Sequence, residues 1–173
     1  MLEKRIFEDK EFLREIDTYI NDERVQSLKN IPHHNSNRLD HSLRVSYVSY
    51  SICKKLGLNY QSVAKAGLLH DLYFNRTTDC KEFKDKVKLY TYEHPMDAVK
   101  NAENLFYLTP LEKNIIVSHM WPLSFKMPKY KESFIVGLVD KYLSFKDFGL
   151  KFQYKLSFLI GAYFLFLTYL IYK

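Results

Sequence analysis

The sequence contains few of the residues that bend, break or cross-link a chain. Its 173 residues include only 5 glycines and 5 prolines, the residues that most often end helices or form tight turns. This scarcity argues against a strand-rich fold with many turns and favours long helices. Cys53 and Cys80 are the only cysteines, and their spacing fits neither a metal knuckle nor a redox pair. Two isolated cysteines suit a reducing cytoplasm, and we expect neither to be catalytic.

Charge of one sign is not concentrated in any stretch. The formal net charge is +6 at pH 7, but lysines and arginines alternate with acids along the chain. We therefore expect no specific nucleic-acid surface, because an anionic small molecule or a membrane surface would suit this charge equally well. Charges also interrupt the apolar pairs of residues 1–20, which excludes the apolar core of a signal peptide there. The length allows one compact domain with an appendage.

One long uncharged run lies near the C-terminus. Residues 156–172, LSFLIGAYFLFLTYLIY, contain no charged side chain. As a helix this run would extend about 26 Å, slightly less than the ~30 Å hydrocarbon core of a bilayer, and flanking lysines can reach the interface. We predict that residues 151–173 form a hydrophobic helix that anchors a cytoplasmic domain to the membrane. Burial of this helix in the domain or in a homodimer is the alternative.

Histidine and aspartate recur on the inward faces of predicted helices. The four histidines placed in this way are His41, His70, His94 and His119. The helices that carry them are predicted at residues 39–56, at 61–73, from Pro95, and from the capping box at Thr109. Two acids share these faces: Asp71 directly follows His70, and Asp140 lies in the apolar helix FIVGLVDKYL. A buried acid costs several kcal/mol unless it is paired or bound to a cation, so Asp140 needs a partner.

Each of these residues alone fits an ordinary packed core, but the set of six does not. Imidazole and carboxylate groups are ligands of first-row transition ions. Six ligands are too many for one tetrahedral zinc, and a mixed nitrogen and oxygen site for two ions fits better. Iron and manganese are the natural occupants, while zinc, cobalt and magnesium stay open.

The order of these residues resembles the HD-domain superfamily of metal-dependent phosphohydrolases, whose name refers to the doublet at His70 and Asp71. The resemblance covers residues ~31 to 146 and implies an all-α, compact helical bundle over residues 1–150, with the metal site between its central helices. It implies that His41, His70, Asp71 and Asp140 hold one ion. The two further histidines resemble the dinuclear branch, in which Asp71 would bridge to a second ion held by His94 and His119.

The activity that this resemblance implies is hydrolysis of a phosphate ester or anhydride by a metal-activated water. The expected substrate is a nucleotide, a dinucleotide or another small phosphorylated molecule. With a single ion, His94 and His119 would instead bind the substrate. A membrane-tethered regulatory module that binds metal or nucleotide without turnover is the alternative from a different functional class.

Three further side chains are candidates for contact with this substrate. Arg38 lies three residues before His41 and can clamp a phosphate, His34 can protonate a leaving group, and Lys141 follows Asp140. The predicted catalytic residues are Asp71, His34 and Lys141, and the predicted substrate-binding residues are Arg38, His34 and Lys141. We exclude His33 from the site. The aromatic residues that can line the pocket are Tyr73, Phe74 and Trp121.

Overall fold

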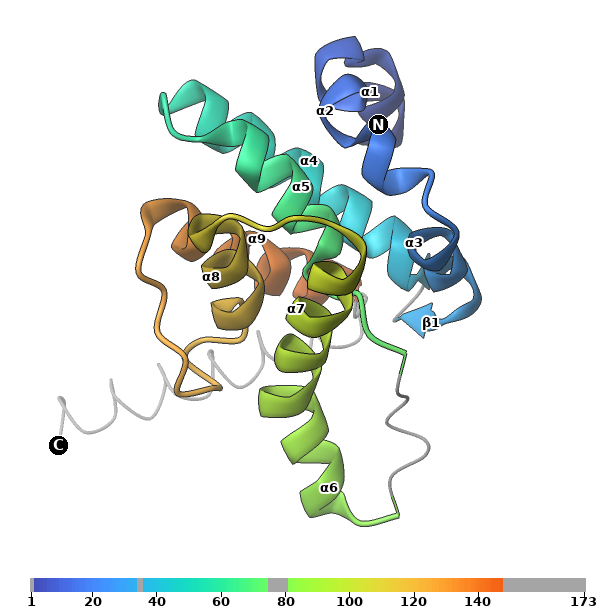
Figure 1. Cartoon of the computed structure of the whole chain (residues 1–173), viewed down its shortest axis with the longest axis vertical. Coiled ribbons are helices and arrows are strands. Elements are labelled where there is room, and N and C mark those ends of the chain that lie inside the picture. Colours follow the sequence, from blue (N-terminus) through green and yellow to red (C-terminus); the bar gives the residue numbers. More distant parts are fainter. Residues whose placement is uncertain (1, 34–35, 75–80, 148–173) are drawn as a thin grey trace, which may run out of the picture.

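A computed structural model of the chain describes residues 2–33, 36–74 and 81–147 (Figure 1). Its helices are α1 (Leu2–Glu8), α2 (Lys10–Ile20), α3 (Glu23–Ser27), the 3₁₀ helix η1 (Leu28–Asn30), α4 (Arg38–Lys55), α5 (Tyr60–Leu69), α6 (Phe83–Lys88), the π-helical turn η3 (Leu89–Glu93), α7 (His94–Leu105), α8 (Pro110–Ser118) and α9 (Lys131–Asp147). The strands described are the two-residue pair β1 (Pro32–His33) and β2 (Ser36–Asn37), which is antiparallel. The predicted all-α fold is confirmed.

Helices α4 and α5 run side by side through the middle of the bundle (Figure 1). Helices α8 and α9 pack against one side of this pair, while α1 and α2 cover another. The close approach of α4 and α5 depends on Gly67, because a Cβ atom there would lie 2.8 Å from the Cα atom of Ser46. The Ser46 hydroxyl also donates to the Ala64 carbonyl at 2.6 Å. Small residues at this contact therefore bring together α4, which carries His41, and α5, which ends just before His70.

The helix boundaries agree with the sequence pattern at several ends. Helix α4 begins at Arg38, one residue before the predicted start, and Gly57 follows it with a φ of 67°. The capping box of α8 is present: the Thr109 hydroxyl accepts from the Glu112 backbone N–H, and the Glu112 carboxylate accepts from that of Thr109. Local backbone chemistry is sufficient to predict these ends.

Helix α5 ends earlier than predicted. It stops at Leu69, so His70 is its C-cap and Asp71 lies in the turn beyond it. The turn is held by Leu72 N–H, which donates to the Leu69 carbonyl at 3.1 Å, and by Tyr73 N–H, which donates to the Asp71 carbonyl at 2.8 Å. The prediction of a helix over residues 61–73 is wrong at this end, because these tight turns replace the helical pattern.

A buried ion pair joins α5 to α8. The Lys65 ammonium lies 3.0 Å from the Glu112 carboxylate, and the side chains are only 10% and 7% exposed. Lys65 also donates to the Tyr107 carbonyl at 2.5 Å. The pair holds α5, which ends just before His70, against α8, which ends just before His119.

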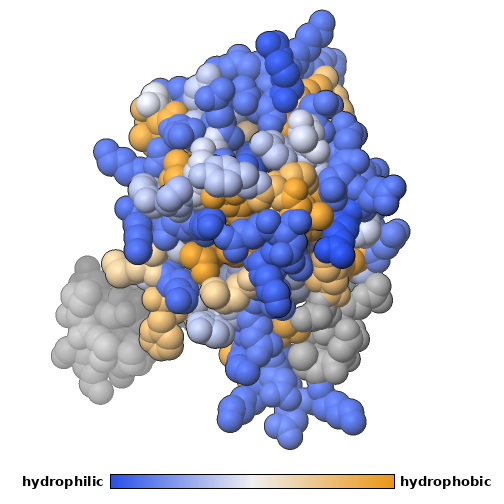
Figure 2. All heavy atoms as spheres, in the orientation of Figure 1, coloured by the Kyte–Doolittle hydropathy of each residue, from blue (hydrophilic) through white to orange (hydrophobic). Residues whose placement is uncertain are grey.

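Helix α6 projects from the body of the bundle (Figure 1) and forms a hydrophilic projection in the space-filling view (Figure 2). None of its residues is buried. It leads through η3 directly into His94, the first residue of α7. The charged residues of α6 thus lead into helical structure directly before His94.

Two predictions fall outside the described residues: the role of His34, and the hydrophobic helix of residues 151–173 with its anchor at 156–172. Across residues 2–33, 36–74 and 81–147, no helix is both long and apolar enough to cross a membrane.

Candidate metal centre

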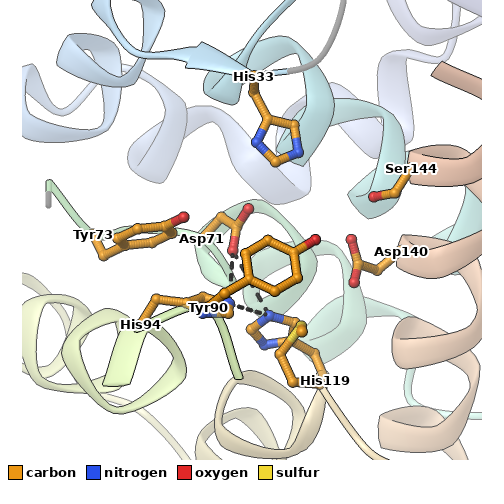
Figure 3. A pocket seen from close by; sticks show the side chains of 9 residues that line it. His33, Asp71, Tyr73, Tyr90, His94, His119, Asp140 and Ser144 are labelled. Atoms are coloured by element: carbon orange, nitrogen blue, oxygen red, sulfur yellow. Dashed lines mark hydrogen bonds and ion pairs between the residues drawn. The ribbon is translucent and has the colours of Figure 1, made fainter. Parts of the chain in front are cut away.

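The structure brings the six predicted metal ligands into one buried cluster. None of them is more than 7% exposed: His41, His70, Asp71, His94, His119 and Asp140. They come from α4, the end of α5, the start of α7, the end of α8, and α9. Figure 3 shows Asp71, His94, His119 and Asp140 around a common pocket. The prediction that all six face the interior is confirmed.

Two of the histidines are oriented by the helix ends on which they lie. His70 and His119 are the C-caps of α5 and α8. The Nδ1 atom of His70 lies 2.8 Å from the Gly67 carbonyl, and that of His119 lies 2.7 Å from the Ile116 carbonyl. Because a carbonyl can only accept, each Nδ1 carries a proton, and in the neutral form of the ring each Nε2 presents a lone pair. This is the tautomer in which histidine binds a metal through Nε2.

His94 reaches the same tautomer through a different local structure. The π-helical turn η3 places the Leu89 carbonyl so that it accepts both the backbone N–H and the Nδ1–H of His94, the latter at 3.1 Å. Single π turns occur frequently at functional sites. Here the turn directs the Nε2 atom of His94 toward the pocket.

One half of the cluster is formed around Asp140. Its Oδ1 atom lies 3.0 Å from Nε2 of His41 and 3.6 Å from Nε2 of His70. The buried Nε2 atom of His70 has no hydrogen-bond partner among the described residues. Burial alone would lower the pKa of His70, but the carboxylates of Asp71 and Asp140 raise it. The position next to His70 Nε2 therefore attracts a cation, either a proton or a metal ion.

The other half contains two imidazoles that face each other. The Nε2 atoms of His94 and His119 are 2.9 Å apart. Burial lowers the pKa of both rings, that of His119 to about 3, so both are neutral at neutral pH and neither Nε2 carries a proton. No hydrogen bond can then join the two lone pairs. Two ligands at right angles and about 2.1 Å from one ion lie about 3.0 Å apart, so the pair fits a shared cation.

Asp71 lies between the two halves. Its Oδ1 atom is 3.6 Å from Nε2 of His94 and 3.7 Å from Nε2 of His119, whereas its Oδ2 atom is 3.7 Å from Nε2 of His70. Burial opposes ionisation of Asp71, but the neighbouring imidazoles, His70 first, hold its pKa below the ordinary value. One carboxylate thus presents a separate oxygen to each half of the cluster.

One comparison with known proteins supports this arrangement. The model of the HD domain family matches residues 38–144, which include all six clustered residues. The chain belongs to the HD domain family. The HD family consists in general of metal-dependent phosphohydrolases, and the clustered imidazoles and carboxylates are compatible with a divalent metal. Searches of the curated proteins and of the solved structures found no match to this chain.

Arg38 is not among the residues that line the pocket, although it was a candidate phosphate clamp. Its guanidinium carbon lies 3.6 Å from the centre of the Tyr73 ring, and its Nη1 donates to the Tyr73 carbonyl. Arg38 is also only 4% exposed. This position supports a structural role for Arg38, which holds Tyr73 in the pocket wall, and does not support the predicted contact with a phosphate.

Lys141 likewise lies beside the pocket rather than in it. Its ammonium donates to the carbonyls of His119 and Gly137, and burial lowers its pKa. It lines a separate, mainly apolar groove together with Trp121 and Phe134. The predicted catalytic and substrate-binding role of Lys141 is not supported by this position, because its charge is directed to the end of α8.

The exclusion of His33 from the site is wrong, because His33 lines the pocket. Three other residues that line the pocket had no expected role: Tyr90, Met120 and Ser144. Tyr90 lies four residues before His94, one helical turn away, and this spacing is a signal that the sequence did contain. Of the three predicted aromatic residues, Tyr73 lines the pocket, Trp121 lines the separate groove, and Phe74 is 40% exposed.

Proposed function

We propose that the chain is a metal-dependent phosphohydrolase that cleaves a phosphate ester or anhydride bond of a nucleotide, a dinucleotide or another small phosphorylated molecule. The observation that carries this proposal is the buried cluster of four imidazoles and two carboxylates inside the matched HD domain. Divalent ions bound there would supply a water of lowered pKa and offset the charge of the phosphoryl oxygens.

The two halves of the cluster suggest how its residues divide between two ions. In this proposal His41, His70 and Asp140 hold the first ion, and His94 and His119 hold the second. Asp71 contributes one oxygen to each, in keeping with the separate distances of its Oδ1 and Oδ2 atoms. Imidazole nitrogens mixed with carboxylate oxygens suit iron or manganese.

The tautomers of His94 and His119 favour two ions over a single-ion site in which these residues bind the substrate. Both rings donate through Nδ1 to backbone carbonyls, and burial lowers the pKa of both. Their Nε2 atoms therefore offer lone pairs to the pocket. A phosphate oxygen also offers lone pairs, so these two histidines are suited to bind a cation and unsuited to bind a phosphate.

Tyr90 is the group best placed to contact the substrate directly. It lines the pocket, and Figure 3 shows its hydroxyl pointing into the space between Asp71 and Asp140. Burial, followed by the charges of Asp140 and Asp71, raises the pKa of Tyr90 to about 12. The hydroxyl therefore keeps its proton at neutral pH and can donate it in a hydrogen bond to a phosphoryl oxygen.

The experiment that tests the proposal is metal analysis of the purified full chain, followed by a screen of mononucleotides, dinucleotides and other phosphoesters with added Mn²⁺ or Fe²⁺. We expect about two ions per chain, as in two-metal hydrolases, and turnover that a chelator abolishes and Mn²⁺ or Fe²⁺ restores. Asp71→Asn should abolish turnover, whereas Asp85→Asn on the projecting helix α6 should leave it unchanged.

A chain that binds no metal and stays inert with both ions would refute this function. Tight nucleotide binding without hydrolysis would instead favour a regulatory module. Association with a membrane through residues 156–172 and formation of a homodimer stay predictions, and flotation of the full chain with vesicles would test the first.

A further inference from the structure

His33 is attached to the start of the helix that carries His41. It lies on β1, whose partner strand β2 ends at Asn37, the N-cap of α4. The Arg38 backbone N–H donates to the Ile31 carbonyl at 3.0 Å, which closes the hairpin against the helix. A pair of two-residue strands contributes little stability by itself. Its effect is to hold the His33 side chain at a fixed place relative to α4.

His33 lies in the wall of the pocket at the metal centre. Figure 3 shows the His33 ring pointing into the pocket, toward Asp71. One donor atom from each of His33, His41 and Asp71 can be chosen so that all three lie within 4.8 Å of one another. The ring centres of His33 and His41 are 4.5 Å apart, with their planes inclined by 41°. A donor set this compact can close on one ion with small side-chain rotations.

We propose that His33 is a further ligand of this metal centre and binds the ion assigned above to His41, His70 and Asp140, to which Asp71 also contributes. The inference rests on the proposed two-ion function and deepens it. His33 reaches the cluster from the pocket side, where water or substrate would otherwise complete the coordination of this ion. More side chains would then hold the first ion than the second, which would leave the second ion the more accessible to substrate.

A metal titration of the full chain in the absence of substrate tests this role. The metal-free protein is titrated with Mn²⁺, and free Mn²⁺ is measured by electron paramagnetic resonance. The variants are His33→Ala and His33→Gln, with Ser36→Ala as the control, because Ser36 lies opposite His33 in the hairpin and is not among the residues that line the pocket. Circular dichroism and thermal unfolding check that each variant folds.

We expect His33→Ala to weaken the binding of one Mn²⁺ by at least about tenfold, since the loss of even an outer partner of a metal ligand costs about 10- to 100-fold in affinity. The other Mn²⁺ should bind as in the wild type. His33→Gln should not restore the affinity, because an amide can replace a hydrogen bond but is a poor ligand for these ions. Ser36→Ala should bind both ions normally.

Wild-type affinity for both Mn²⁺ ions in His33→Ala would overturn the inference, and a raised KM in that variant would then assign His33 to substrate contact. Restoration by His33→Gln would also overturn it, because the role would then be hydrogen bonding. The proposed function fails separately. Suppose that the chain binds two Mn²⁺ ions in a His33-dependent way but hydrolyses no phosphoester. That result would support His33 as a metal ligand and would refute the proposed phosphohydrolase function.

Discussion

Replacing Gly67 with alanine should destabilise the bundle and disturb the metal centre together. The added Cβ atom would lie 2.8 Å from Ser46 Cα and 3.3 Å from Ser46 N, whereas carbon atoms in contact are about 3.5–4.0 Å apart. Both neighbours belong to the backbone of α4, so α4 and α5 must separate by roughly 1 Å. The carbonyl of Gly67 also accepts from Nδ1 of His70, so the same movement displaces a proposed ligand.

The magnitude follows from two opposing contributions. Overpacking of a well-packed contact costs about 1–3 kcal/mol, and a clash with backbone belongs at the upper end. Alanine is favoured over glycine within a helix by about 1 kcal/mol, which offsets part of this. We expect Gly67→Ala to lower the free energy of unfolding by about 2 kcal/mol, or the Tm by about 4–8 °C for a chain of this size.

Thermal unfolding and Mn²⁺ titration of Gly67→Ala measure both effects, and Gly57→Ala is the matched control. Nothing lies within 4 Å of a Cβ at Gly57, but its φ of 67° is left-handed, so alanine there costs about 1 kcal/mol. The control should lose stability and keep its Mn²⁺ affinity. A Gly67→Ala protein as stable as the wild type, with unchanged Mn²⁺ binding, would refute the close-approach argument.

Three further predictions concern the cluster and its support. Asp71→Ala should lose both ions while His119→Ala mainly weakens the second, as measured by metal content per chain; full occupancy in Asp71→Ala would contradict the bridging role. Lys65→Met leaves the Glu112 carboxylate buried without its ammonium and should lower the free energy of unfolding by about 3 kcal/mol in a denaturant titration; a change below about 1 kcal/mol would show that the pair contributes little. The pKa of His70 is raised in the metal-free protein, so Mn²⁺ binding to His70 must release its proton. Mn²⁺ affinity should therefore fall by up to about tenfold per pH unit as the pH drops below that pKa. An Mn²⁺ affinity independent of pH would show that His70 is not a ligand.

The site residues that could be predicted are those whose inward position follows from the helical spacing of apolar residues. His41, His94 and Asp140 lie within helices, where the spacing of apolar neighbours shows which face points inward. All three are buried in the structure. The capping box at Thr109 is equally local and was equally predictable. For such residues, the element and its buried face are determined by neighbours within a few positions in the chain.

The parts that could not be predicted depend on tertiary contacts or on very short elements. His33 reaches the pocket through a pair of two-residue strands, too short to leave a periodic pattern. Arg38 differs from its prediction because Tyr73, 35 residues away, accepts its hydrogen bond. The position of Lys141 differs from its prediction because the end of α8 lies beside α9. The Lys141 ammonium donates to the His119 carbonyl there. None of these three placements has a signal within its own segment.

The histidine tautomers have a consequence for how the site can recognise an anion. The Nδ1 protons of His70 and His119 are held by carbonyls three residues earlier in the chain, so the inward lone pairs are determined by the local fold at two helix ends. The pocket's imidazoles are thereby prepared for cations before any ligand arrives. A phosphate entering between Asp71 and Asp140 would meet two carboxylates and the Nε2 lone pairs of the neutral His94 and His119 rings, all of which repel it. Recognition of a phosphate at this site therefore requires bound cations, supplemented by neutral donors such as the hydroxyl of Tyr90.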